Sequence, residues 1–168
     1  MYNRFISYLN FLWHSKNEHG VHSPFIFNYV TQCLYSKKKY SSDKTQNMVL
    51  KSLAYFQCQS LTIVPAHPGL ESLVKNIFPH IPLENWSAEL IFIADCNEDL
   101  LQTYIYTNKN IGNNTMVVLG NIYKGKESAI LWKRLKEYNK VTVTVDMYHC
   151  AAIFFRKEQV GQHFKIRI

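Results

Sequence analysis

The chain has 168 residues, 47% of them hydrophobic, and a formal net charge of +7. This length fits one domain with a substantial core, and the apolar content excludes a disordered chain. The positive charge permits nucleic acid, an anionic membrane surface or an acidic protein as partner. Nucleic-acid binding would rest on charge alone, so we do not expect it, and no apolar stretch is long enough to span a bilayer.

The four cysteines, at positions 33, 58, 96 and 150, are widely spaced and have no histidine at zinc-ligand spacing beside them. We therefore expect no metal site and a reducing, cytoplasmic location. The apolar start of the chain is interrupted by polar residues and has no small-residue cleavage site, which argues against a signal peptide.

Residues 1–40 predict an N-terminal helical cap. Apolar and aromatic residues recur at helical spacing in the first segment: Tyr2, Phe5, Ile6, Leu9, Leu12 and Trp13. Ser23-Pro24 then predicts the start of a second helix that continues to about Tyr35. We expect the body of the protein to bury the first helix's apolar stripe. The alternative is a protein partner or a second copy of the chain at these helices.

Three consecutive lysines, Lys37, Lys38 and Lys39, follow the cap beside several serines. We interpret this run as a solvated linker to a second unit, residues 41–168. The alternative is a phosphate-contacting patch, which requires further basic residues to converge on the run in space.

Residues 41–168 predict an α/β fold. Ser42 or Asp43 can cap a third helix, and three strand–helix units follow, with strands at 61–64, 90–94 and 115–119. Strands that are apolar throughout indicate a parallel sheet with helices on both faces. The segments 141–145, 151–155 and 164–168 leave no room for helices between them, so their connections must be antiparallel.

Two stretches carry a family resemblance: HGVHSPF at 19–25, and at the other end VTVTVD at 141–146, FFRKEQ at 154–159 and HFKIRI at 163–168. They resemble class I S-adenosylmethionine-dependent methyltransferases, specifically a group of small Bacteroidetes methyltransferase-like proteins. The resemblance implies a Rossmann-like sheet, mostly parallel with a C-terminal antiparallel hairpin. Only about ten residues, 79–89, separate the first strand–helix unit from the next strand, too few for the family's second and third strands. We therefore expect a reduced sheet of about five strands.

The positions that would hold the cofactor depart from the family pattern. The turn after the first strand carries two prolines where the family has an acidic residue and glycines, and proline removes N–H donors. The family's later acidic stretches survive only as Asp95 with Asn97, and as Asn121. These positions define a predicted remnant crevice: Pro65, Ala66, His67, Gly69, Asp95, Asn97 and Asn121. The sequence identifies no catalytic residue among them.

The resemblance, together with the loss of the cofactor-binding positions, favours a methyltransferase-like protein that has lost cofactor binding and catalysis. Such a protein would act as a binding or interaction module. The alternative is an active S-adenosylmethionine-dependent methyltransferase on an unknown small molecule.

Single residues also have structural interpretations. Asp95 either binds a ligand or caps a helix, His67 is either a general base or a surface histidine, and Arg156 either joins a surface ion network or docks the N-terminal helices.

Overall fold

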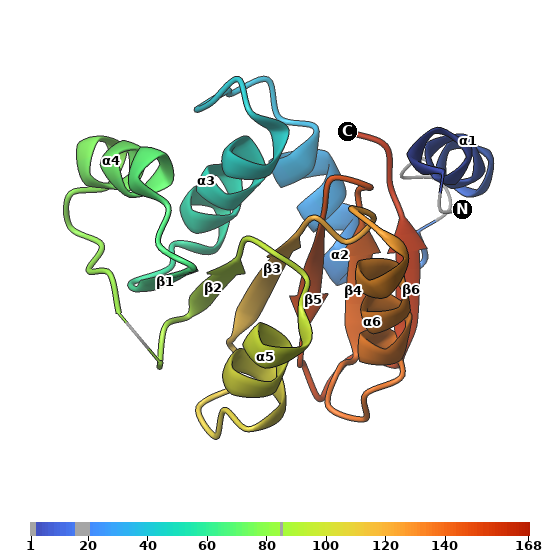
Figure 1. Ribbon diagram of the computed structural model, residues 1–168. Helices are drawn as coiled ribbons and strands as arrows, with labels where there is room; N and C mark the ends of the chain where they lie inside the picture. Colours follow the sequence, from blue (N-terminus) through green and yellow to red (C-terminus); the bar gives the residue numbers. More distant parts are fainter. Residues whose placement is uncertain (1–2, 16–20, 85) are drawn as a thin grey trace.

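The computed structural model describes residues 3–15, 21–84 and 86–168. The first two residues of the HGVHSPF stretch, His19 and Gly20, lie outside these ranges. The fold is built on a six-stranded sheet with the strand order β1-β2-β3-β5-β4-β6 (Figure 1). The strands are β1 Leu61–Val64, β2 Leu90–Ile93, β3 Met116–Gly120, β4 Val143–Asp146, β5 Cys150–Phe154 and β6 Gln162–Lys165.

The sheet is parallel except at β5, which runs antiparallel to both of its neighbours, β3 and β4. The predicted α/β class, the mostly parallel sheet and the antiparallel hairpin of β4 and β5 are confirmed. The expected number of about five strands is corrected to six. The sixth strand is β6, at the edge of the sheet. It pairs in parallel with the side of β4 that faces away from β5, with Val145 opposite Phe164.

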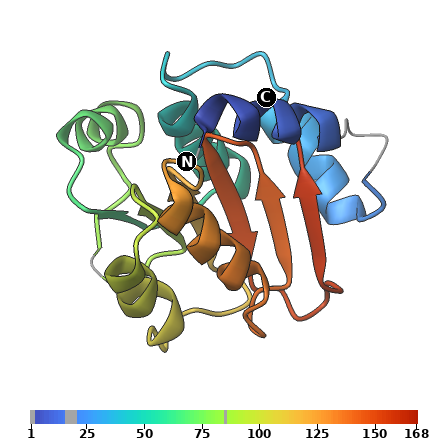
Figure 2. The ribbon, with the colours of Figure 1, turned by 45° about the vertical axis from the view of Figure 1, so that its right-hand side comes forward.

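Helices cover both faces of the sheet (Figures 1 and 2). They are α1 Arg4–His14, α2 Pro24–Asn28 with the π-helical turn η2 Tyr29–Leu34, α3 Lys44–Phe56, α4 Pro68–Ile77, α5 Glu98–Leu101 with the π-helical turn η3 Gln102–Tyr106, and α6 Lys126–Lys136. Successive strand residues point to opposite faces, so the sheet supports two cores. Along β3, Val118 joins the core under α2, η2, α3 and α4, whereas Val117 joins the core under α5, η3 and α6.

Side-chain caps fix the helix starts that the sequence predicted. The Ser23 hydroxyl accepts a hydrogen bond from the Ile26 N–H at the start of α2, and the Asp43 carboxylate accepts one from the Gln46 N–H at the start of α3. Such caps stabilise a helix by about 1 kcal/mol each.

The segment after β5 holds α2 in place. The Arg156 guanidinium lies 4.6 Å from the centre of the Phe25 ring, and the Ser23 hydroxyl donates to Gln159 Oε1 at 2.8 Å. Arg156 therefore docks an N-terminal helix, as one of its two interpretations expected, and its contact with Glu158 is a longer 3.9 Å.

α1 departs from expectation. It lies across the carboxyl-end edge of the sheet (Figure 2) and docks through Phe11 and Tyr8, whose rings contact Tyr148 at 5.5 and 4.8 Å. Phe11 is its buried residue, while four members of the predicted stripe are exposed: Phe5 at 66%, Ile6 at 63%, Leu9 at 49% and Trp13 at 87%. The expectation that the protein's own core buries this stripe was wrong. Within the described ranges, no helix combines the length and hydropathy that crossing a membrane would need.

Candidate functional site

A pocket of about 350 Å³ lies where β1, β2 and β3 end. Parallel strands finish at the same edge of a sheet, and ligands of open α/β folds bind there. α3 reaches the same edge with its first turn, because only residues 57–60 separate its last residue from the start of β1. The lining residues are Asp43, Thr45, Gln46, Pro65, Ala66, His67, Phe92, Ala94, Asp95, Gly120 and Asn121. The volume is in the range of small-molecule sites.

Five of the seven residues of the predicted crevice meet in this pocket: Pro65, Ala66, His67, Asp95 and Asn121. The other two lie outside its lining. Gly69 is in the first turn of α4, and the Asn97 side chain caps α5 by accepting a hydrogen bond from the Leu100 N–H at 3.0 Å. The helix cap that one interpretation assigned to Asp95 is therefore supplied by Asn97.

Asp95 is held by the loop that follows β3. Its Oδ1 atom accepts hydrogen bonds from Asn121 Nδ2 at 2.8 Å and from Lys124 Nζ at 3.2 Å. Asn121 adopts a left-handed backbone conformation with φ 55, and its Nδ2 also donates to the Ala94 carbonyl at 3.1 Å. The carboxylate is thus already engaged by two donors, although it is still partly exposed to the pocket.

The floor of the pocket is a close approach between two strand ends. A Cβ atom placed on Gly120 would lie 2.5 Å from the Ala94 carbonyl oxygen and 3.2 Å from its carbonyl carbon. No side chain fits between these backbones, which explains glycine at this position.

His67 serves as the N-cap of α4. Its Nδ1 accepts a hydrogen bond from the Leu70 N–H at 3.2 Å, and its own N–H donates to Glu71 Oε1 at 3.1 Å. An accepting Nδ1 places the proton of the neutral ring on Nε2. In this tautomer His67 can donate to a ligand but has no free lone pair with which to take a proton, so the geometry does not favour a general base.

The charged side chains that line the pocket are acidic, and the charge of Asp95 is offset in part by its ion pair with Lys124. Among the described lining residues Asp43 and Asp95 are the charged groups, and neither Lys nor Arg is present. Such a lining favours a neutral or cationic ligand over an anion. The contributions of Asp43, Thr45 and Gln46 were missed from the sequence. The short connection between α3 and β1 is the signal that could have placed them at this edge.

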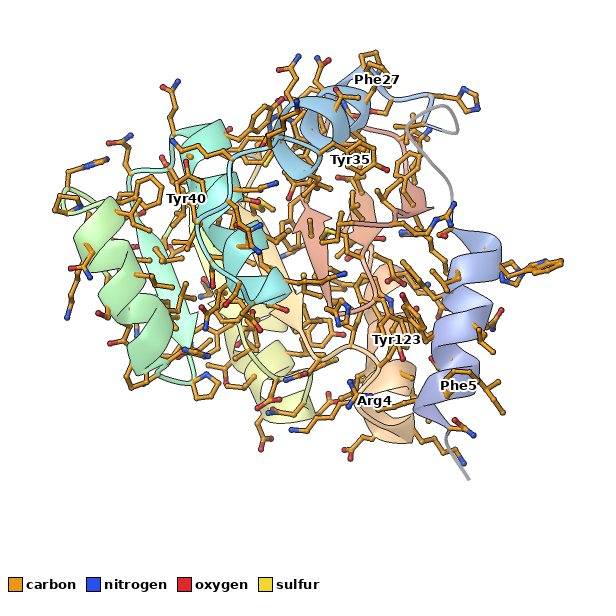
Figure 3. All side chains as sticks on the ribbon, turned by 90° about the horizontal axis from the view of Figure 1, so that it is seen from above. Arg4, Phe5, Phe27, Tyr35, Tyr40 and Tyr123 are labelled. Carbon is orange, nitrogen blue, oxygen red and sulfur yellow. The ribbon has the colours of Figure 1, made fainter. Side chains whose placement is uncertain are left out.

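A second carboxylate, Asp146, is buried beneath α1 at the end of β4, only 3% exposed. It accepts hydrogen bonds from the Tyr123 hydroxyl at 2.5 Å, Trp132 Nε1 at 3.3 Å and the Tyr148 N–H at 2.9 Å. Burial raises the pKa of Asp146, and these three donors oppose that rise. Tyr123, labelled in Figure 3, stacks on Tyr148, and the Tyr8 and Phe11 rings of α1 pack against Tyr148. This network therefore joins the helix to the sheet.

The chain matches no protein-family model, no curated protein and no solved structure. In the part of the chain that the structure describes, no three His, Cys, Asp or Glu side chains gather in a way that could hold a metal ion.

Proposed function

We propose that this protein is a methyltransferase-like protein that has lost cofactor binding and catalysis and acts as a binding or interaction module. The sheet supports the first part of this proposal. An antiparallel strand, β5, lies between the parallel strands β3 and β4, which agrees with the parallel sheet and closing hairpin that the resemblance to class I methyltransferases implies.

The observation that carries the loss of cofactor binding is the position of β1 at the sheet edge. In the described residues its strand partner is β2 alone, and its outer side has a single bridge, between Leu61 and Leu83. The family's second strand, which ends in the acidic residue that holds the cofactor ribose, would lie on that side. Without it, the outer side of β1 lacks the strand, and the acidic residue at its end, that would hold the ribose of the cofactor.

The turn after β1 also supports the loss of cofactor binding. Pro65 and Pro68 have no N–H, and the His67 N–H and ring are used to cap α4. Little main chain remains there to donate hydrogen bonds to a cofactor carboxylate.

Isothermal titration calorimetry with S-adenosylmethionine and S-adenosylhomocysteine tests the loss directly. We expect no saturable heat at ligand concentrations up to about 1 mM, because neither the ribose nor the methionine part has a defined partner. Micromolar binding of either compound would contradict the proposal.

The pocket itself favours one alternative, an active methyltransferase that holds the cofactor in an unusual pose. Its acidic lining suits a sulfonium cation, and methyl transfer chiefly requires that the electrophile and nucleophile be held in line. Crystals soaked in S-adenosylmethionine decide this point. Density in the pocket beside Asp95 would support the active enzyme, and an empty pocket would exclude this version of it.

The exposed face of α1, formed by Phe5, Ile6, Leu9 and Trp13, is the surface that supports an interaction module. Contiguous exposed apolar side chains on a helix mark a protein contact, so we infer that a second copy of the chain or another protein covers them. Sedimentation velocity of the wild type and of Leu9→Ser/Trp13→Ser separates the two. A dimer that the double variant dissociates assigns the face to self-association, and monomers in both samples exclude self-association. Asn10→Ser on the same helix is the control.

A further inference from the structure

A second groove, of about 500 Å³, lies on the other side of α3 from the crevice. It is bounded by the end of η2, by the segment 36–43, by the first turns of α3 and by residues 167–168. Its lining residues are Leu34, Tyr35, Lys39, Ser41, Ser42, Lys44, Asn47, Met48, Lys51, Arg167 and Ile168. Tyr35, directly before the bounding segment, and Tyr40, within it, are labelled in Figure 3.

The groove gathers positive charge. Lys39, Lys44, Lys51 and Arg167 line it, and its described lining contains no Asp or Glu. None of the four forms an ion pair with an acidic side chain in the described part of the chain. Lys44 Nζ donates to the main-chain oxygen of Ile168 at 3.0 Å. Even if that oxygen belonged to a terminal carboxylate, the other three cations would remain without a counter-charge.

Lys51 is the most informative of these residues, because it is only 9% exposed. Its ammonium group donates to the carbonyls of Leu34 at 2.9 Å and Ser36 at 2.7 Å. An ammonium has three N–H groups, so one remains for a ligand. Burial lowers the pKa of Lys51, which reflects the cost of keeping this charge away from water. An anion in the groove would offset that cost.

The groove is held in shape before any ligand binds. Asn47 Oδ1 accepts hydrogen bonds from the N–H groups of Tyr40 at 2.8 Å and Ser41 at 3.3 Å, and the Tyr40 ring lies 5.7 Å from that of Phe78. Lys37, Lys38 and Lys39 are all exposed, as the interpretation of a solvated linker expects, and Lys39 also lines the groove. The basic residues that the alternative required do converge on this segment.

We propose that this groove binds a phosphate ester that carries an apolar tail. The three unpaired cations suit a doubly charged head group, which accepts several charge-assisted hydrogen bonds. The apolar side chains of the lining, Leu34, Tyr35, Met48 and Ile168, suit an aliphatic or aromatic body next to that head. The groove is independent of the crevice, because Lys44, Asn47 and Lys51 lie on one face of α3 whereas Asp43 and Gln46 line the crevice.

Calorimetric titration with octyl phosphate tests the proposal, with octanol and inorganic phosphate as ligands that lack the charge or the tail. We expect saturable binding of octyl phosphate, and binding at least about tenfold weaker for each of the other two. Equal binding of octanol and octyl phosphate would overturn the proposal. Sedimentation with phosphatidylcholine vesicles that contain phosphatidic acid provides a second arm, because a lipid head group offers the same chemistry.

Two matched variants locate the site. Lys39→Gln/Arg167→Gln removes two positive charges from the groove, and Lys37→Gln/Lys38→Gln removes two from the exposed neighbouring positions. We expect the first to weaken binding at least about tenfold and the second to change it less than about twofold. Binding in either arm that is lost only in the first variant supports the groove. Binding in neither arm, or equal behaviour of the two variants, overturns the proposal.

Discussion

Replacing Gly120 by alanine tests the close approach of β2 and β3 that forms the floor of the crevice. The added Cβ would lie 2.5 Å from the Ala94 carbonyl oxygen, whereas carbon and oxygen in contact are separated by at least about 3.3 Å. The strand ends must then move apart by roughly 0.8 Å. The Ala94 carbonyl is main chain, a Cβ is fixed to the backbone, and Gly120 lies in the paired strand β3, so no side-chain rotation can relieve the contact.

Overpacking of this kind costs about 1–3 kcal/mol of unfolding free energy. In a protein of this size, each kcal/mol lowers the melting temperature by about 2–4 °C. Urea unfolding followed by circular dichroism measures the change. Gly112→Ala is the control, since a Cβ there has no atom within 4 Å, and we expect it to stay within about 0.5 kcal/mol of the wild type. If both variants are equally stable, the strand ends do not approach as described.

Two further predictions concern buried titratable groups. Burial raises the pKa of Asp146, so the folded protein binds the carboxyl proton more tightly than the unfolded chain does. The stability that results is present at acid pH and is lost as the pH rises through the folded pKa. The unfolding free energy of the wild type minus that of Asp146→Asn should therefore fall as the pH rises above about 4, the pKa of an ordinary Asp, and a constant or rising difference would contradict the assignment. Burial also raises to about 12 the pKa of all four thiols, which are free: Cys33, Cys58, Cys96 and Cys150. Ellman's reagent at about pH 8 should find no reactive thiol in the native protein and four in denaturant, and rapid reaction of the native protein would refute this.

The sequence was a reliable guide wherever local pattern decides the structure. Apolar runs located the strands, Ser23 and Asp43 were recognised as caps, and the shared edge of parallel strands brought Asp95 and Asn121 together. Each of these features follows from short-range spacing or from strand direction.

Features that depend on distant neighbours were missed. Helical spacing showed that α1 has an apolar face, but Phe11, the residue that docks it, was outside the predicted stripe because the partner, Tyr148, lies far along the chain. Alternation identified β6 as a strand without revealing that it pairs with β4. The basic groove joins Lys39 to Arg167, and no spacing rule connects residues so far apart.

The partners of α2 and η2 have a consequence for how the chain folds as it is made. The rings of Phe25 and Tyr29 pack against Phe154 at 5.1 and 5.6 Å, so these two side chains leave the ribosome well before their partner and must wait for it. At about 5–20 residues per second, that wait lasts on the order of 6–25 s. During this interval the aromatic side chains of α2 and η2 lack their partner Phe154 and are accessible to chaperones.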